Sequence, residues 1–321
     1  MATAGTLPLG WSLGAHERVR GRTADHAWLR SHARGAMLGL AIGDALGATL
    51  EFMTPREIRV EYGVHDRIRG GGWLRLASGQ VTDDTSMAFS LAESLLRAGQ
   101  QASAEDFAQA FDAWMRSKPV DIGHTVRRGI ARYRRTGETC VPQSDDAGNG
   151  ATMRCAPVAL ALLGAAPDRV ATTTLAQARV THHNPLTDAA TLTVVNMVQA
   201  GVAGAGIGAL MAQAHLLVRE FPAFRFRGGR RAENPSGYIV DTLGAVLQGI
   251  DINDSFESVL IDVVNRGGDA DTTGAIAGAI MGALAGEEGL PERWVRALDG
   301  SARKQCIDHA DALIAASPAW G

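Results

Sequence analysis

The sequence predicts an all-α fold, a single-domain compact helical bundle. Apolar residues recur at helical spacing along most of the chain, and aromatic residues make up only 5% of it. No segment sustains the alternation of apolar and polar residues that is typical of a β-strand. The helical stretches also lack βαβ alternation, which argues against a Rossmann-type nucleotide-binding enzyme.

The first residues differ from the rest of the chain. Residues 1–28 have no clear period, and we expect an irregular, partly disordered extension there, followed by one domain over residues 29–321. A chain of 321 residues has room for about two domains. One domain is nevertheless expected, because no linker-like segment interrupts residues 30–315.

Two helices are unusual because glycine recurs in them at every fourth position, which places the glycines on one helix face. Glycine weakens a helix, so its repetition indicates that another helix packs very close to that face. These glycines are Gly35, Gly39, Gly43 and Gly47 in the first helix and Gly274, Gly278, Gly282 and Gly286 in the second. We expect both helices at the centre of the bundle.

Apolar periodicity and stop signals predict the remaining helices. They are expected over residues 85–98, 104–116, 122–135, 155–164, 187–218, 236–249, 254–265 and 302–315. Two long loops are expected over residues 63–79 and 221–235. Long loops in a helical domain are often functional.

Composition and charge argue against several classes of protein. A hydrophobic content of 46% excludes intrinsic disorder, and a net charge of −3 argues against a protein that binds nucleic acid by neutralising phosphates. Three cysteines without CxxC spacing indicate a reducing compartment. No apolar stretch approaches the roughly 20 residues of a transmembrane helix. Since the start of the sequence also lacks the features of a secretory signal, we expect a cytoplasmic protein.

Two short acidic motifs carry the strongest chemical signal. VTDDT contains Asp83 and Asp84, and GDADTT contains Asp269 and Asp271, each just before an apolar helix. Aspartate is a good helix cap, but two neighbouring carboxylates exceed what a cap needs and repel each other. A divalent cation would relieve this repulsion, and an all-oxygen ligand set favours Mg²⁺ or Mn²⁺ over Zn²⁺. On the pattern alone, helix capping and metal binding remain alternatives.

Five motifs together resemble the ADP-ribosylglycohydrolase family. In chain order they are GLAIGDALGATLEF, VTDDT, GNGATMRCAP, THHNP and GDADTTGAIAGAI. The resemblance implies an all-α enzyme that hydrolyses the N-glycosidic bond between ADP-ribose and an arginine side chain. It also implies a centre of two divalent ions, Mn²⁺ or Mg²⁺. By motif, their ligands would be Thr82, Asp83, Asp84, Asp269, Asp271 and Thr272.

The same resemblance implies catalytic and substrate-binding residues. Asp121 and Glu51 would be the catalytic carboxylates, and either of them could steer a water molecule or a ribose hydroxyl. A general acid would assist departure of the basic guanidine, and Asp121 is the better candidate if burial raises its pKa. The substrate-binding residues would be Gly123, Gly148, Asn149, Gly150, Ala151, Thr152, Met153, His182 and Tyr238. His183 directly follows His182, and either histidine could be the one that works.

Three further segments, GGGWLRL, RSKPVDIGHT and SGYIVDTL, resemble the members of this family that act on dinitrogenase reductase. They imply that the acceptor is this iron protein, so that the enzyme would regulate nitrogen fixation. They also imply a PII-type signalling partner and regulated association with the membrane surface. Two alternatives remain, an enzyme for another ADP-ribosylated arginine and a non-catalytic protein that binds ADP-ribose or serves a structural role.

Overall fold

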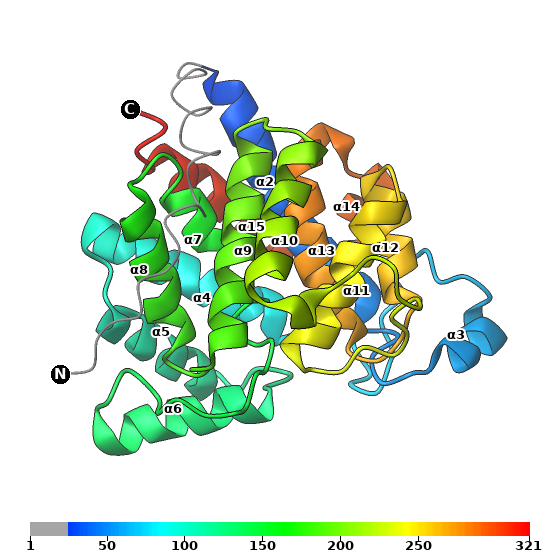
Figure 1. Ribbon diagram of the computed structural model, residues 1–321, viewed down its shortest axis with the longest axis horizontal. Helices are drawn as coiled ribbons and strands as arrows, with labels where there is room; N and C mark the ends of the chain where they lie inside the picture. Colours follow the sequence, from blue (N-terminus) through cyan, green and yellow to red (C-terminus); the bar gives the residue numbers. More distant parts are fainter. Residues whose placement is uncertain (1–24) are drawn as a thin grey trace.

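The computed structural model describes residues 25–321, which form a bundle of α-helices without a β-strand (Figure 1). This arrangement confirms the predicted all-α fold. The α-helices are α2 (His26–Gly47), α3 (Pro55–Tyr62), α4 (Asp83–Ala98), α5 (Ala104–Arg116), α6 (His124–Thr136), α7 (Ala156–Ala161), α8 (Pro167–Ala178), α9 (Pro185–Val202), α10 (Ile207–Glu220), α11 (Ile239–Ile252), α12 (Phe256–Val264), α13 (Ala270–Ala285), α14 (Glu292–Ala297) and α15 (Gly300–Ala315). Three short 3₁₀ helices are η1 (Gly99–Gln101), η2 (Pro222–Phe224) and η3 (Glu287–Gly289).

The two glycine-rich helices, α2 and α13, pack against each other in the middle of the bundle (Figure 1). A Cβ atom on Gly39 would stand 2.2 Å from the carbonyl oxygen of Gly278, and one on Gly35 would stand 2.3 Å from that of Gly282. Such distances are far below any real contact, so only glycine permits this approach. The predicted close packing is therefore present, and each glycine helix is the partner of the other.

The order of these contacts shows that α2 and α13 run antiparallel. Gly35 lies opposite Gly282, whereas Gly47 lies opposite Ala270. The carboxyl end of α2 consequently meets the amino end of α13. This meeting point brings the turn that contains Glu51 next to the second acidic motif.

Asp44 of α2 holds the first acidic motif, VTDDT, close to the junction of α2 and α13. The carboxylate of Asp44 accepts hydrogen bonds from the backbone N–H of Thr82 at 3.0 Å and from the Thr85 hydroxyl at 2.5 Å. Thr82 caps α4, since its hydroxyl accepts from the backbone N–H of Asp84. The start of α4 is thus fixed to α2 near the start of α13.

Some predicted element boundaries are wrong. Residues 187–218 form two helices, α9 and α10, because Gly204 and Gly206 adopt φ values of +72° and +75° that end one helix and start the next. Helices α3, α8 and α14 were not expected. Helices α3 and α8 each have a proline in their first turn, which is a usual start signal.

Most of the predicted N-terminal extension, residues 1–28, lies outside the described residues. The final part of that range already belongs to α2, which begins at His26 with Asp25 as its cap. No helix within residues 25–321 is long and apolar enough to cross a membrane.

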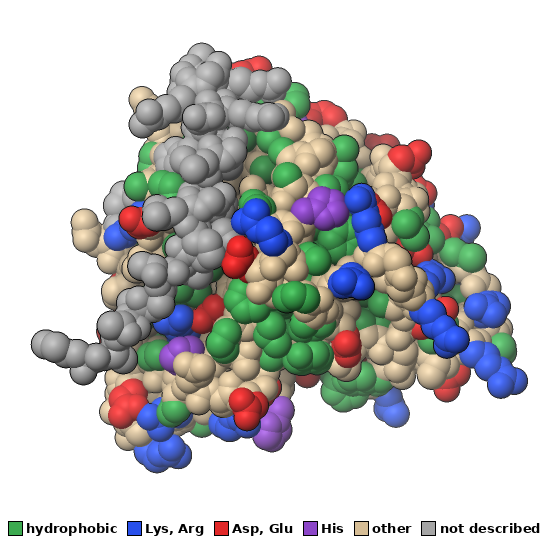
Figure 2. All heavy atoms as spheres, viewed as in Figure 1, with side chains coloured by type: hydrophobic (Ala, Val, Ile, Leu, Met, Phe, Trp, Pro, Cys, Tyr) green, Lys and Arg blue, Asp and Glu red, His purple; other side chains and the backbone are tan. Residues whose placement is uncertain are grey.

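The predicted loop over residues 221–235 is present and contains η2. Figure 2 shows Lys and Arg side chains on the right of this face, over α11, α12 and α3. Two arginines of this loop form ion pairs. Arg227 pairs with Asp251, and Arg231 pairs with Asp262 at 2.5 Å. These ion pairs neutralise part of the basic surface.

Candidate active site

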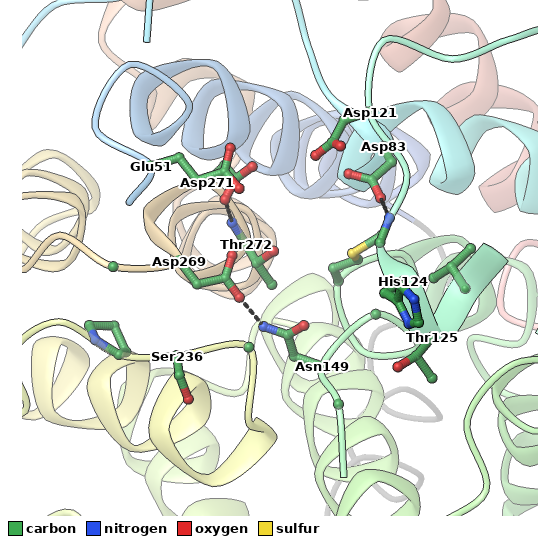
Figure 3. A pocket seen from close by; sticks show the side chains of 18 of the residues that line it. Glu51, Asp83, Asp121, His124, Thr125, Asn149, Ser236, Asp269, Asp271 and Thr272 are labelled. Atoms are coloured by element: carbon green, nitrogen blue, oxygen red, sulfur yellow. Dashed lines mark hydrogen bonds between the residues drawn. The ribbon is translucent and has the colours of Figure 1, made fainter. Parts of the chain in front are cut away.

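Two groups of carboxylates face each other across an open space at the helix ends described above (Figure 3). Glu51, Asp269 and Asp271 lie on one side, and Asp83 and Asp121 lie on the other. The N-termini of α4 and α13 favour nearby negative charge because their first backbone N–H groups are unpaired in the helix. The fold therefore brings together two acidic motifs that are 185 residues apart (269 − 84) in the sequence.

The acid groups offer oxygen atoms close enough to share an ion. One oxygen from each of Glu51, Asp269 and Asp271 lies within 4.8 Å of the others. One oxygen of Asp84 accepts from the hydroxyls of Thr82 at 3.2 Å and Thr272 at 3.5 Å. Its other oxygen, Oδ1, is buried and has no hydrogen-bond partner.

Burial and mutual repulsion make these carboxylates hard to ionise. Burial, followed by repulsion from Asp121, raises the pKa of Asp83 to about 7. Burial raises the pKa of Glu51 to about 8, against the opposing hydrogen bond from Trp73. The pKa values of Asp84 and Asp271 are also raised well above their ordinary values, again chiefly by burial. Divalent cations would compensate this charge, and the all-oxygen donor set suits Mg²⁺ or Mn²⁺.

A cavity of about 630 Å³ opens between these acids and the loop before α7. It is lined by Glu51, Phe52, Trp73, Asp83, Asp121, Ile122, Gly123, His124, Thr125, Val126, Asp146, Gly148, Asn149, Gly150, Met153, His182, Asn234, Pro235, Ser236, Gly237, Gly268, Asp269, Asp271 and Thr272. Asp121 accepts a hydrogen bond from the backbone N–H of Ile122 at 2.7 Å. The next residue, Gly123, donates its N–H to Asp83 at 3.1 Å.

The loop that contains Asn149 is joined to the acid cluster. The Asn149 amide donates to Asp269 at 2.5 Å and to the Thr242 hydroxyl at 2.9 Å, and Figure 3 shows the first of these bonds. Ala151 and Thr152 do not line the cavity. Both are buried, and Thr152 bonds to Thr191 at 2.8 Å.

The structure distinguishes the two adjacent histidines. His182 lines the cavity beneath the Asn149 loop, whereas Nδ1 of His183 bonds to the carbonyl of Val141 at 2.9 Å, away from it. Burial lowers the pKa of His182 to about 3, so its ring is neutral at ordinary pH. Tyr238 forms an isolated bridge with Gly148 and is half exposed, outside the lining of the cavity.

An aromatic pair beside the acids was missed by the sequence analysis. Phe52 is 64% exposed and Trp73 is 53% exposed, their ring centroids are 5.3 Å apart, and both line the cavity. The Trp73 indole N–H donates to Glu51 at 2.5 Å. Gly72, with φ of +65°, lets the loop approach α2, because a Cβ there would stand 2.4 Å from the Ala48 carbonyl oxygen. The run of glycines before Trp73 was the available signal.

Two further acidic residues were not among the predicted site residues. Asp44 is fully buried and organises the start of α4, and its signal was a lone aspartate inside an apolar helix. Asp146 lines the cavity and accepts from Thr125 at 2.9 Å and from Arg128 at 2.6 Å.

Comparisons with known proteins show which family this chain resembles. The sequence model of the ADP-ribosylglycohydrolase family matches residues 25–321. The chain is 48% identical to an ADP-ribosyl-[dinitrogen reductase] glycohydrolase of Rhodospirillum rubrum over 89% of this chain and 97% of that protein. It is 33% identical to an ADP-ribosylarginine hydrolase of Pseudomonas putida over 88% and 81% of the two chains. A solved structure described as an ADP-ribosylglycohydrolase-related protein complex superposes with a TM-score of 0.78 at 35% identity, covering 90% of this chain and 98% of that one.

Proposed function

The chain belongs to the ADP-ribosylglycohydrolase family, and we propose that it is a metal-dependent hydrolase that removes ADP-ribose from an arginine side chain of an acceptor protein. The observation that carries this proposal is the convergence of Glu51, Asp83, Asp121, Asp269 and Asp271 on one cavity. Carboxylates in such surroundings are typical of catalytic sites. Hydrolysis of a glycosidic bond needs a sugar held in place, an activated water and a proton for the leaving group.

The all-oxygen acid cluster suits divalent cations, and the proposal is that two of them bind. Their ligands would be Thr82, Asp83, Asp84, Asp269, Asp271 and Thr272. The unpartnered, buried Oδ1 of Asp84 is the type of atom that an ion would satisfy, and Glu51 contributes an oxygen to the neighbouring cluster. Mn²⁺ or Mg²⁺ bound there would supply Lewis acidity and orient the ribose hydroxyls.

Asp121 is the better placed of the two carboxylates for proton transfer to the leaving guanidine. Glu51 shares the group of oxygens that could hold an ion, whereas Asp121 lies on the opposite wall, outside that group (Figure 3). Asp121 would then act as the general acid at the guanidine nitrogen, and Glu51 would orient water or a ribose hydroxyl. In the same proposal, the substrate is held by Gly123, Gly148, Asn149, Gly150, Met153 and His182, with Ala151 and Thr152 supporting the loop from below and Tyr238 beside it.

The aromatic pair supports arginine as the modified residue. A guanidinium is attracted to aromatic faces and is recognised well by Trp and Phe. Trp73 and Phe52 flank Glu51 at the cavity, so the cationic group of the acceptor would lie between aromatic rings and carboxylates.

The identity to the Rhodospirillum rubrum relative supports dinitrogenase reductase as the acceptor and regulation of nitrogen fixation as the role. The Pseudomonas putida relative supports a second candidate, another ADP-ribosylated arginine. The PII-type partner, the association with the membrane surface and the cytoplasmic location stay predictions.

The test is release of ADP-ribose from arginine-modified dinitrogenase reductase with Mn²⁺, with a chelator and with the Asp269→Ala variant. Asp308→Ala is the matched control, because Asp308 is an exposed carboxylate on α15. We expect release that requires both the metal and Asp269. Release only from other modified arginine peptides would exclude this acceptor. Absence of release from every substrate, with ADP-ribose still bound, would favour a non-catalytic binding protein.

A further inference from the structure

Arg154 is a fully buried cation behind the Asn149 loop. No carboxylate within residues 25–321 forms an ion pair with it. Its guanidinium donates to the side-chain and backbone oxygens of Gln177, both at 2.9 Å, and lies 4.3 Å from the centre of the Phe111 ring. Burying a cation without a counter-charge costs free energy, so the neutral oxygen atoms that accept its hydrogen bonds must offset this cost.

One of those acceptors connects Arg154 to the cavity. Arg154 also donates to the hydroxyl oxygen of Thr181 at 2.9 Å. A guanidinium has no acceptor atom, so Thr181 must accept in this bond. A hydroxyl oxygen can accept twice, but Nδ1 of His182, at 2.8 Å, is the only other partner of this hydroxyl within residues 25–321. Because a buried donor left unpaired is costly, the hydroxyl proton is directed to Nδ1.

This direction determines which nitrogen of His182 carries a proton. A neutral imidazole has one N–H group and one acceptor nitrogen, and burial keeps this ring neutral by lowering its pKa. If Nδ1 accepts from Thr181, the single proton lies on Nε2.

The Nε2 atom lies at the cavity side of the ring. A Cβ on Gly148 would stand 3.0 Å from Nε2, and one on Gly150 would stand 2.8 Å from Cε1, so only glycine leaves room for the imidazole. No group within residues 25–321 forms a hydrogen bond with Nε2. The nearby carboxylate of Asp146 accepts from Thr125 and Arg128 through Oδ2 and forms no hydrogen bond with Nε2.

We infer that Arg154 is a positioning residue that acts through Thr181 to hold His182 in the tautomer with its proton on Nε2. The histidine then donates a hydrogen bond to an oxygen of the bound ADP-ribosyl group, either in its diphosphate or on a ribose. The identity of this ligand rests on the proposed function, whereas the tautomer does not.

The direct test is ¹⁵N NMR of the full chain labelled at histidine, because two-bond couplings distinguish the two tautomers. We expect His182 in the wild type to be protonated on Nε2. Thr181→Val keeps the shape of the side chain but removes the hydroxyl, and we expect it to shift the His182 signals toward the other tautomer. Thr181→Ser keeps the hydroxyl and should restore them. Thr174→Val is the matched control, since that buried hydroxyl bonds only within α8.

Binding of free ADP-ribose gives a second readout. Loss of one well-placed hydrogen bond should weaken binding about tenfold in Thr181→Val, with Thr181→Ser and Thr174→Val close to the wild type. His182→Gln, whose amide reaches the Nε2 position, should bind more tightly than His182→Asn, whose amide reaches only the Nδ1 position.

Two results would overturn the inference. They are a wild-type proton on Nδ1, and a His182 tautomer that stays the same in Thr181→Val. The expected tautomer in a protein that does not bind ADP-ribose would support the role of Arg154 and Thr181 but contradict the proposed ligand. The two failures are therefore distinguishable, and the wild-type spectrum decides the first even if a variant does not fold.

Discussion

The carbonyl oxygen of Gly274 lies where a side chain on Gly43 would have to be, since a Cβ on Gly43 would stand only 2.0 Å from it. Backbone cannot move aside as the end of a flexible side chain can. The separation of α2 and α13 is thus fixed by the absence of side chains.

Gly39→Ala should therefore lower the free energy of unfolding, by about 2–3 kcal/mol or more, because the added methyl group forces the two helices apart. The measurement is denaturant unfolding. Gly244→Ala on α11 is the matched control. Within residues 25–321, no atom apart from the neighbouring backbone of α11 lies within 4 Å of the Cβ position there, so this change should stabilise the protein by up to about 1 kcal/mol. Equal destabilisation by both changes would contradict the explanation.

The hydrogen bond between Thr85 and Asp44 should support metal binding from outside the ligand set. Thr85→Val removes the hydroxyl donor from a fully buried carboxylate, which should cost about 1–3 kcal/mol of stability. It should also weaken Mn²⁺ binding about tenfold or more, because supporting residues orient metal ligands. Isothermal titration with Mn²⁺ measures the second effect, and Thr85→Ser should restore both. Unchanged affinity in Thr85→Val would show that Asp44 does not organise the site.

The raised pKa values predict how pH affects the metal-free protein. The folded chain holds protons on Asp83 up to about pH 7 and on Glu51 up to about pH 8, whereas the unfolded chain loses them near pH 4. The folded state binds more protons, so the free energy of unfolding should fall as pH rises from about 4 to 8. Buried His182, with its pKa lowered to about 3, acts in the opposite sense.

The contribution of the acid cluster can be isolated with Asp84→Asn, which removes one repelling charge and leaves His182 unchanged. Its melting temperature with chelator should fall less between pH 5 and pH 8 than that of the wild type. Added Mn²⁺ should stabilise the wild type more at pH 8 than at pH 5, because an ion binds the deprotonated carboxylates. Parallel pH profiles for the two proteins would contradict this explanation.

Trp73 should affect recognition of the acceptor more than binding of ADP-ribose. Trp73→Ala removes an aromatic face and the donor to Glu51, and we expect the KM for an arginine-modified protein to rise about tenfold. Trp73→Phe should lose less of this affinity. Val60→Ala is the control, since Val60 is exposed on α3 and does not line the cavity. A KM that rises equally for Val60→Ala would remove the case for an arginine subsite.

Asp121→Ala should lower kcat by a factor of about 10²–10⁴, the usual contribution of a general acid. Mn²⁺ affinity should change little, because Asp121 lies outside the shared oxygen cluster. Near-normal turnover with intact metal binding would transfer the acid role to Glu51.

Much of the fold was predictable because the glycine spacing is periodic and local. The four-residue repeats identify α2 and α13 as helices with a close neighbour, and the structure supplies only which neighbour it is. The break between α9 and α10 was harder to predict. Helix α9 is buried on all sides from Thr187 to Val202, so its sequence has no polar face whose loss would mark an end.

The sequence alone identified the aspartates of the two acidic motifs as candidate site residues, because paired aspartates before apolar helices are chemically unusual. Their supporting residues were not. Asp44 looks like any residue of a helix until its contacts with Thr82 and Thr85 are known. The pairing of Phe52 with Trp73 depends on how the loop over residues 63–79 folds back against α2, which no local pattern specifies.

The glycine contacts between α2 and α13 have a consequence for how such a protein can diversify. Substitutions in this helix pair cannot reshape the wall of the cavity that carries Glu51, Asp269 and Asp271 without forcing the two helices apart, since any side chain there meets backbone. Adaptation to a different modified protein must therefore arise in the loops that carry Trp73 and Ser236, where substitutions leave the helix pair intact. The helix pair would keep the same reaction, while the loops at the cavity entrance change which modified proteins are bound.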